Sequence, residues 1–181
     1  MTDTRTLVLV GSLRADSYNR RLAHAVREQA PVGSSVEVAT GLDRLPFYNE
    51  DLDNEFVPAE VAEFRALVAA SDRVLVFTPE YNGTMPAVLN NAIDWLSRPF
   101  GAGALRGKPL AVVGTSVGAH GGQWAHQDVQ RSAKVAGAQV VEDIVLNHQY
   151  AWGSDPVADA ATVELFVEAL GKLTAYEVIA A

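Results

Sequence analysis

A short polar segment near the start of the chain has the residue types of a phosphate-binding loop. The apolar run Thr6–Val10 ends at Gly11, and an amphipathic helical pattern begins shortly after it. The polar residues between them are Ser12, Arg14, Ser17, Tyr18 and Asn19. Loop hydroxyls and a guanidinium would there join the unpaired N–H groups and the positive dipole end of a helix N-terminus. Helix capping by Ser17 or Asn19 is the alternative, but it leaves Ser12 and Arg14 unexplained, so we favour phosphate binding.

A second loop is rigid and carries an aromatic side chain. It reads Thr78-Pro79-Glu80-Tyr81-Asn82-Gly83-Thr84-Met85-Pro86 and follows a buried apolar run. Two prolines and a glycine constrain its backbone, and an exposed ring such as Tyr81 can stack against or border a planar ligand. The alternative is a proline-rich turn whose tyrosine packs on the core. The loop alone does not decide between the two.

A third loop, Gly114–Gly122, is rich in glycine, which lets backbone approach a ligand closely. His120 could face that ligand, but a plain strand-to-helix turn accounts for it equally well. The stretch Gly114-Thr115-Ser116-Val117-Gly118 also matches the nucleophile elbow of serine hydrolases. Asp143 and His148 follow in the required order, but they lie close together around one strand and no oxyanion loop is evident. A hydrolase with Ser116 as nucleophile is therefore a minor alternative.

Composition narrows the class of protein. The chain has 181 residues, 49% hydrophobic and 20% charged, which is typical of one globular domain spanning residues 1–181. The formal net charge of −8 argues against nucleic acid or an anionic membrane as partner, because both require a basic face. We interpret Arg20 and Arg21 as solvated helix positions within this acidic background.

Several kinds of site and segment are missing from the sequence. The absence of cysteine excludes disulfides and cysteine-ligated clusters. We expect no metal site, because His120 and His126 lack helical ligand spacing and no carboxylate–histidine cluster accompanies them. Neither a signal-peptide pattern nor a membrane-spanning apolar run is visible, so we expect a cytoplasmic protein.

Strand-like and helix-like patterns alternate along the chain. The expected strands are Thr6–Val10, Val36–Ala39, Arg73–Thr78, Pro109–Val113 and Gln139–Ile144. Five helices are expected. The first carries the periodic residues of 22–30, the second begins at Pro58 and the third at Pro86, the fourth spans about Gln123–Val135, and the last begins near Pro156. This alternation predicts an α/β fold with a doubly wound, five-stranded parallel sheet and helices on both faces. Ligands bind such sheets beyond the carboxyl ends of the strands, where all three loops would meet.

Together the loops resemble those of the NADPH-dependent FMN reductase family of flavodoxin-like proteins, which includes bacterial quinone and chromate reductases. The matching segments are Gly11-Ser12-Leu13-Arg14 with Ser17-Tyr18-Asn19, Pro79-Glu80-Tyr81-Asn82-Gly83 with Pro86, and Asn91-Ala92-Ile93-Asp94-Trp95-Leu96-Ser97-Arg98-Pro99. The resemblance spans nearly the whole chain. It implies a flavodoxin-like fold, bound FMN, and NADPH or NADH as the electron donor.

The resemblance also implies roles for individual residues. The FMN phosphate would be held by Ser12, Arg14, Ser17 and Asn19 with nearby amides. The isoalloxazine ring would be lined, largely through backbone, by Pro79, Glu80, Tyr81 and Asn82, with Ser116 and Gly118 flanking the ring or ribityl chain. The remaining cofactor-binding candidates in these loops are Gly11, Tyr18 and Gly83. The helix carrying Trp95 would belong to a dimer surface, or Trp95 is instead a core residue.

The expected function is therefore an oxidoreductase that passes hydride from NAD(P)H via FMN to a quinone or a similar small acceptor. No catalytic side chain is expected, since the flavin carries the chemistry. A flavodoxin-like electron carrier without direct NAD(P)H reactivity is the main alternative. The resemblance also implies a homodimer or homotetramer, while the donor preference and the physiological acceptor stay open.

Overall fold

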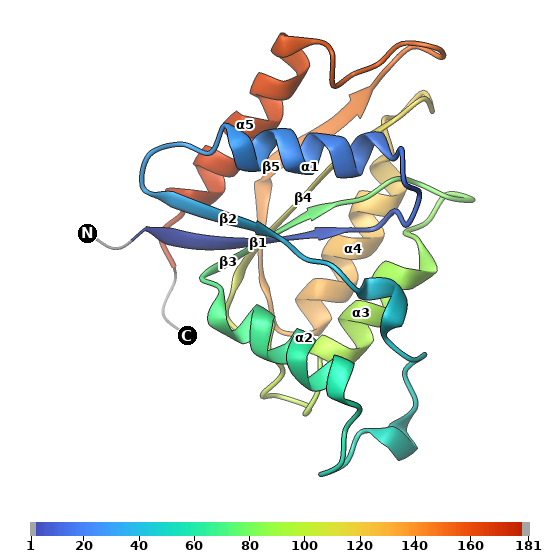
Figure 1. The fold of residues 1–181 in the computed structure, drawn as a ribbon, viewed down its shortest axis with the longest axis vertical. Helices are drawn as coiled ribbons and strands as arrows, with labels where there is room; N and C mark the ends of the chain where they lie inside the picture. Colours follow the sequence, from blue (N-terminus) through green and yellow to red (C-terminus); the bar gives the residue numbers. More distant parts are fainter. Residues whose placement is uncertain (1–2, 179–181) are drawn as a thin grey trace.

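The computed structural model describes residues 3–178 and shows a parallel sheet between two layers of helices (Figure 1). The strands are β1 (Thr4–Val10), β2 (Ser34–Val38), β3 (Arg73–Phe77), β4 (Pro109–Ser116) and β5 (Gln139–Gln149), in the spatial order β2-β1-β3-β4-β5. The helices are α1 (Tyr18–Glu28), α2 (Ala59–Ala70), α3 (Ala87–Leu96), α4 (Gln123–Val135) and α5 (Ala160–Thr174). The predicted doubly wound α/β fold is confirmed. Residues 1–2 and 179–181, the ends of the predicted domain, lie outside the described residues.

Each face of the sheet has its own hydrophobic core. Successive strand residues point to opposite faces, so Leu7 and Leu9 of β1 pack with α2, α3 and α4, whereas Val8 and Val10 pack with α1 and α5. The two layers are visible above and below the sheet in Figure 1. Burial on both faces explains why the central strands are continuous apolar runs rather than alternating patterns.

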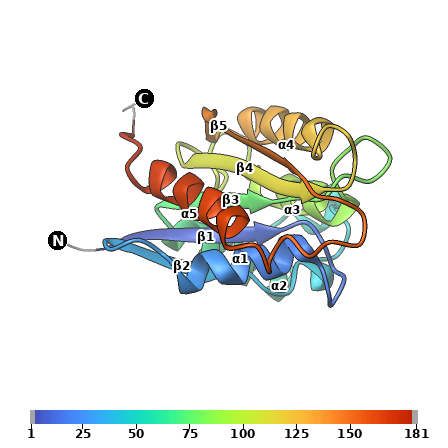
Figure 2. The same cartoon turned by 90° about the horizontal axis from the view of Figure 1, so that it is seen from above.

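The strand order reverses at β1, which pairs in parallel with β2 on one side and β3 on the other. In open α/β sheets, a crevice for ligands forms outside the carboxyl ends of the strands at this kind of switch point. The carboxyl ends of β1, β3 and β4 lie together at the right of Figure 2. Hydrogen bonds continue across these ends, from the N–H of Gly11 to the carbonyl of Phe77 (2.8 Å) and from the N–H of Thr78 to the carbonyl of Val113 (3.0 Å).

The predicted ends of the last two strands need correction. β4 continues to Ser116 and β5 to Gln149, because Gly114, Thr115 and Ser116 pair with residues 147–149. The pairing register shifts between Leu110 and Val112, which face Val140 and Val145. This irregularity places extra residues in β5 and interrupts its alternation. The first part of the expected third loop is therefore strand.

The boundaries of two helices also differ from the prediction. α5 begins at Ala160 rather than near Pro156, because the side chain of Asp159 accepts a hydrogen bond from the N–H of Ala161 and caps the helix there. α1 begins at Tyr18, directly after the N-cap Ser17. Two short 3₁₀ helices, Leu42–Arg44 and Glu50–Leu52, lie in the long connection between β2 and α2. No helix in residues 3–178 has the length and apolar character needed to cross a bilayer.

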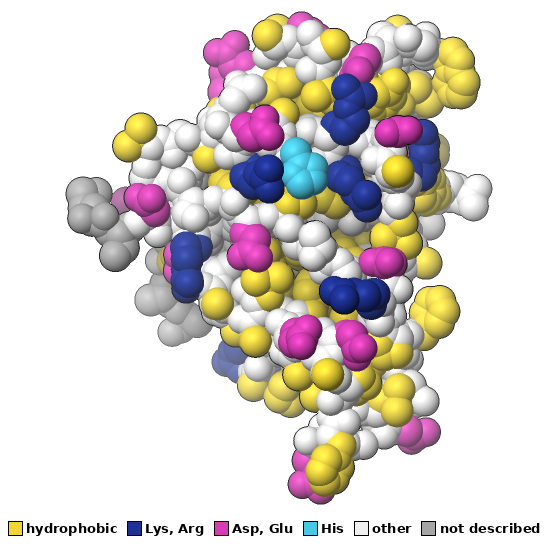
Figure 3. Space-filling model, viewed as in Figure 1, with side chains coloured by type: hydrophobic (Ala, Val, Ile, Leu, Met, Phe, Trp, Pro, Cys, Tyr) yellow, Lys and Arg dark blue, Asp and Glu magenta, His cyan; other side chains and the backbone are white. Residues whose placement is uncertain are grey.

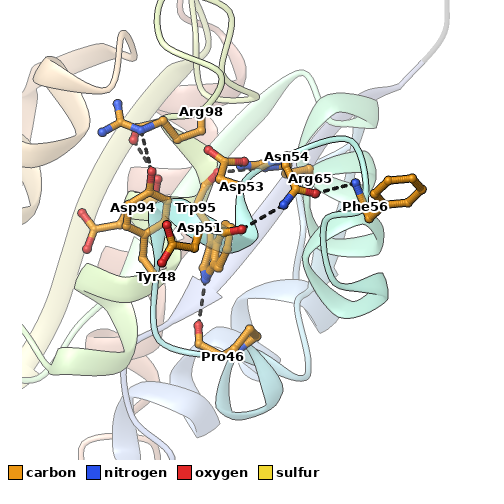
Figure 4. A network of polar contacts seen from close by, with 11 residues as sticks. Pro46, Tyr48, Asp51, Asp53, Asn54, Phe56, Arg65, Asp94, Trp95 and Arg98 are labelled. Atoms are coloured by element: carbon orange, nitrogen blue, oxygen red, sulfur yellow. Dashed lines mark hydrogen bonds and ion pairs between the residues drawn. The ribbon is translucent and has the colours of Figure 1, made fainter.

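Trp95 anchors the connection between β2 and α2 to the core (Figure 4). Its side chain is fully buried, and its indole N–H donates to the carbonyl of Pro46 at 2.8 Å. The ring of Tyr48 packs edge-on against it at 4.9 Å, and Arg65 donates both to the carbonyl of Trp95 and to the carboxylate of Asp53. Trp95 is therefore a core residue, the second of the two interpretations.

Candidate functional site

A hollow of about 200 Å³ lies where the carboxyl ends of β1, β3 and β4 meet. It is lined by Ser12, Arg14, Ser17, Tyr18, Asn19, Pro79, Glu80, Tyr81, Thr115, Ser116, Val117, Tyr150 and Trp152. The structure thus brings candidates from all three loops together. Gly11, Asn82, Gly83 and Gly118 are neighbours of lining residues in the chain but do not themselves line the hollow.

Sequence reasoning missed four lining residues. Thr115 and Val117 belong to the third loop, for which the sequence predicted only Ser116 and Gly118 as cofactor-binding residues. Tyr150 and Trp152 follow β5, whose end was predicted too early. A longer β5 would have placed both aromatic residues at the carboxyl edge of the sheet.

The first loop offers a row of free backbone donors. Within residues 3–178, the N–H groups of Ser12 to Asp16 donate no hydrogen bond to another protein group. The side chains of Ser12 and Ser17 are almost fully buried beside them, whereas Arg14 is exposed. Leu13 to Asp16 are exposed, so water can pair with their N–H groups until a ligand replaces it. Consecutive free amides, two hydroxyls and a guanidinium form a donor set suited to an oxyanion.

Arg20 and Arg21 of α1 differ in their exposure: Arg21 is exposed, as interpreted from the sequence, whereas Arg20 is half-buried. Arg20 donates to the carbonyl of Ser12 at 3.4 Å, which ties α1 to the first loop. Arg21 forms a 2.8 Å ion pair with Asp155 and lies over the ring of Tyr18 at 5.6 Å. Arg20 therefore helps to hold the first loop, and Arg21 packs on the neighbouring ring of Tyr18.

Tyr18 and Tyr150 form an aromatic pair at the border of the hollow. Their ring centroids are 5.1 Å apart and the rings are nearly perpendicular. Burial, followed by the neighbouring Tyr18, raises the pKa of the Tyr150 hydroxyl above its usual value. The Tyr150 hydroxyl is therefore protonated at neutral pH and can donate a hydrogen bond.

Asn19 connects the first loop to the end of β4. Its Oδ1 accepts from the N–H of Thr115 at 2.9 Å, and its Nδ2 donates to the carbonyl of Thr115 at 3.0 Å. Both bonds are buried. The side-chain amide thus satisfies both backbone groups of Thr115, leaving one Nδ2 hydrogen for a ligand.

The second loop closes on itself in a tight turn. Tyr81 and Thr84 exchange backbone hydrogen bonds of 3.1 Å, and Asn82 and Gly83 between them have φ of 53° and 72°. Positive φ at both central positions is the type I′ geometry that Asn-Gly favours. Tyr81 is 46% exposed, so its ring is not packed on the core and is free to contact a ligand.

The side chain of Glu80 binds the start of α4. One carboxylate oxygen accepts from the N–H groups of Trp124 (2.9 Å) and Ala125 (3.1 Å). The N-cap Gly122 has no side chain to do this, so Glu80 caps α4 from another loop and lies at its positive dipole end. The second and third loops are thereby joined.

Gly114 allows three elements to meet behind the hollow. A Cβ at this position would lie 2.2 Å from the carbonyl oxygen of Thr78 and 2.7 Å from Nε2 of His126, so no larger residue fits. His126 is 3% exposed, and this burial lowers the pKa of its imidazole below the usual value. The histidine is therefore neutral at pH 7. We infer that it supports the third loop by packing beneath it.

The geometry does not support the hydrolase alternative. The hydroxyl of Ser116 accepts from the N–H of Gly118 at 3.1 Å. His148 instead contacts the hydroxyl of Thr115 through Nδ1 (2.8 Å) and that of Thr162 through Nε2 (3.4 Å). Asp143 is exposed on the bulged part of β5. The three residues of the proposed triad are therefore not linked to one another.

His120 has a neighbour that the sequence did not reveal. Its ring stacks on Trp124, with centroids 5.6 Å apart and an interplanar angle of 22°. A Cβ at Gly83 would lie 3.2 Å from the Trp124 ring, so this aromatic pair also adjoins the turn of the second loop. The pair therefore lies beside the second loop, and neither ring lines the hollow.

The chain is similar in sequence to a known protein family and to several reductases. Residues 4–153 match the model of the family described as NADPH-dependent FMN reductase. The chain is 44% identical over 142 residues to a 2-hydroxy-1,4-benzoquinone reductase of a Burkholderia species, which covers 78% of this chain and 73% of that protein. It is 47% identical over 125 residues to a quinone reductase of Pseudomonas putida, covering 69% and 67% of the two chains.

Solved structures give the same picture at the level of the fold. The flavoenzyme NAD(P)H:(acceptor) oxidoreductase FerB from Paracoccus denitrificans superposes with a TM-score of 0.83 at 31% identity, covering 94% of this chain and 95% of that one. A flavodoxin variant from Pseudomonas aeruginosa superposes with a TM-score of 0.58 at 18% identity, covering 93% and 99%. The latter likeness shows only the shared fold.

Proposed function

The chain belongs to the NADPH-dependent FMN reductase family, and we propose that it binds FMN at the first loop and reduces quinone-type acceptors with NAD(P)H. It is accordingly an NAD(P)H-dependent FMN and quinone reductase. The chemistry that bound FMN supplies is two-electron transfer between a nicotinamide donor and such an acceptor. The observation that carries the proposed site is the run of free amides from Ser12 to Asp16 beside the hollow.

The donor set of the first loop fits a phosphate group. A phosphate monoester has three acceptor oxygens and a charge near −2, so it needs several donors at one point. The loop amides, the hydroxyls of Ser12 and Ser17, and the guanidinium of Arg14 would supply these donors. The N-terminus of α1 adds the favourable end of its dipole.

The other two loops fit a flat ring next to that phosphate. Tyr81 presents an exposed aromatic side chain, and the Asn82–Gly83 turn presents backbone amides that are not used by the Tyr81–Thr84 bonds. Backbone N–H groups near the ring would stabilise negative charge that develops on it. Glu80 is occupied at α4, so we assign it to holding the loops in place rather than to contact with the ring.

Arg14 gives a direct test of the phosphate assignment. Arg14→Ala removes one charge-assisted hydrogen bond, worth about 1.5–3 kcal/mol, so the Kd for FMN should rise roughly 10- to 150-fold. Turnover of the fully loaded enzyme should change much less, because Arg14 lies at the phosphate and not at the reacting ring. Lys172→Ala, which removes an exposed charge on α5, is the matched control. Equal FMN affinity in Arg14→Ala and wild type would refute the assignment.

The proposed activity is tested by absorbance spectra of the purified protein. After FMN is added and excess is removed, anaerobic NADPH or NADH should bleach the retained flavin, and a quinone should restore its colour. Retained flavin that neither nucleotide bleaches would point to the electron-carrier alternative. Failure to retain flavin would refute the proposed function at its first step.

A further inference from the structure

A second and larger hollow lies between α1 and the end of β2. Its volume is about 450 Å³, and we call it the α1–β2 hollow. Leu13 of the first loop lines it, whereas the adjacent Ser12 and Arg14 line the candidate FMN site. The two hollows therefore share the first loop as a wall, and nothing in the proposed FMN site uses the second one.

Basic side chains gather around the α1–β2 hollow. Arg20 and His24, one turn apart on α1, both line it. The guanidinium of Arg44 lies against Gly41, another lining residue, where an added Cβ would be 2.9 Å from the arginine Nε. Figure 3 shows a histidine side chain between two basic side chains over the position of α1. Arg20 and Arg27 are the basic neighbours that act on His24.

Two of these basic residues, Arg20 and Arg44, form no ion pair with a carboxylate in the described part of the chain. Arg21, by contrast, pairs with Asp155 at 2.8 Å. Asp43 is the one acidic side chain that lines the hollow. Burial is the main cause that lowers the pKa of His24; the positive charges of Arg27 and Arg20 lower it further, and Glu28 opposes them. A bound anion would relieve this repulsion.

The rest of the lining suits the body of a nucleotide. Val10, Leu13, Val38 and Leu42 form an apolar wall. Thr40 and Asp43 add polar groups that can bond hydroxyl or amino groups of a sugar or base. Pockets of this size, mostly apolar with a few polar groups, are typical of small-molecule sites.

We propose that the α1–β2 hollow binds a second nucleotide, with Arg20 and His24 contacting a phosphomonoester and the apolar wall receiving the attached sugar or ring. A phosphomonoester matches this pair because it has three acceptor oxygens and a charge near −2. A carboxylate offers only two oxygens and a single charge. The link to turnover rests on the proposed function, which offers two sources of this chemistry. One is the 2′-phosphate of NADPH, which NADH lacks; the other is free FMN acting as a substrate.

The test is calorimetric titration of the FMN-saturated protein with three probes: adenosine 2′-monophosphate, adenosine, and additional FMN. Arg20→Gln and His24→Gln each remove one basic contact, and Lys172→Gln is the control for loss of charge. Because Arg20 also touches Ser12, His24→Gln keeps the test valid if Arg20→Gln impairs the first loop. We expect one phosphorylated probe to bind, adenosine not to bind, and each hollow variant to weaken binding about tenfold or more while the control does not.

The outcomes separate the two sources of ligand. Binding of adenosine 2′-monophosphate with this variant pattern supports the site and identifies the NADPH donor, and the variants should then lose preference for NADPH over NADH. Binding of a second FMN with this pattern supports the site and identifies a flavin substrate. Absence of both, or binding that the variants leave unchanged, overturns the proposal. Failure to saturate the protein with a first FMN would instead count against the proposed function, and the adenosine probes would still test the hollow.

Discussion

Replacement of Asn19 distinguishes a residue that supports the site from one that only binds the phosphate. In the structure its side chain occupies both backbone groups of Thr115, with bonds of 2.9 and 3.0 Å. Asn19→Ala would leave a buried N–H and a buried carbonyl unpaired. We therefore expect a loss of stability in the protein without FMN, before any ligand is considered.

The magnitude follows from the two orphaned groups. Each buried polar group left without a partner costs about 1–3 kcal/mol, and the better helix propensity of alanine returns about 0.5 kcal/mol. The free energy of unfolding should therefore fall by about 1.5–5.5 kcal/mol. With a urea m-value of about 2 kcal/mol/M, the unfolding midpoint should shift by roughly 0.7–2.8 M.

Urea unfolding of the FMN-free protein, followed by circular dichroism, measures this change. Asn90→Ala is the matched control, because Asn90 is an exposed helical asparagine and its replacement should stay within about 0.5 kcal/mol of wild type. An Asn19→Ala protein with unchanged stability but weakened FMN binding would refute the supporting role. It would show that Asn19 acts on the ligand directly.

Three further predictions concern the parts that join the loops. Glu80→Ala removes the acceptor for two N–H groups at the start of α4 and should cost about 1–2 kcal/mol in urea unfolding, with Glu80→Gln costing less because it keeps an acceptor. Gly114→Ala forces a Cβ to 2.2 Å from a carbonyl oxygen, so unfolding should occur at a markedly lower temperature, whereas Gly118→Ala, whose Cβ meets only Ser116 Oγ at 3.4 Å, should stay near wild type. The lowered pKa of buried His126 means that the unfolded chain takes up a proton more readily than the folded one, so stability should fall as pH drops below about 6.5, and the fall should be smaller in His126→Gln. An equal pH slope in both proteins would contradict that last prediction.

The sequence was sufficient for the sheet, the helices and the three loops because local signals mark them. Continuous apolar runs indicate strands buried on both faces, and Pro58 and Pro86 stand at the N-caps of α2 and α3 as their fixed φ favours. The end of β5 was missed for an equally local reason. Glu142 and Asp143 interrupt the alternation at a bulge, so the pattern stops before the strand does.

The internal bonds of the site lay beyond sequence reasoning because their partners are far apart in the chain. Asn19 and Thr115 are separated by 96 residues, and Glu80 reaches an amide 44 residues away. Periodicity and motif spacing report only on neighbours along the chain. The same limit applies to Trp95, whose burial depends on Pro46 and Tyr48 in a segment without regular pattern.

A motif residue can therefore support a ligand site through its bonds to the protein itself. Asn19 and Glu80 stand inside the two segments that resemble the family most, and both line the hollow. The side-chain hydrogen bonds of each go to backbone groups of the protein. Removing either should weaken FMN binding indirectly, because the loops that carry the free amides and Tyr81 would no longer be held together. Affinity measurements alone would then assign both residues to the cofactor. Stability of the FMN-free protein separates the two roles, since a residue that only contacts FMN has no bond to lose before FMN binds.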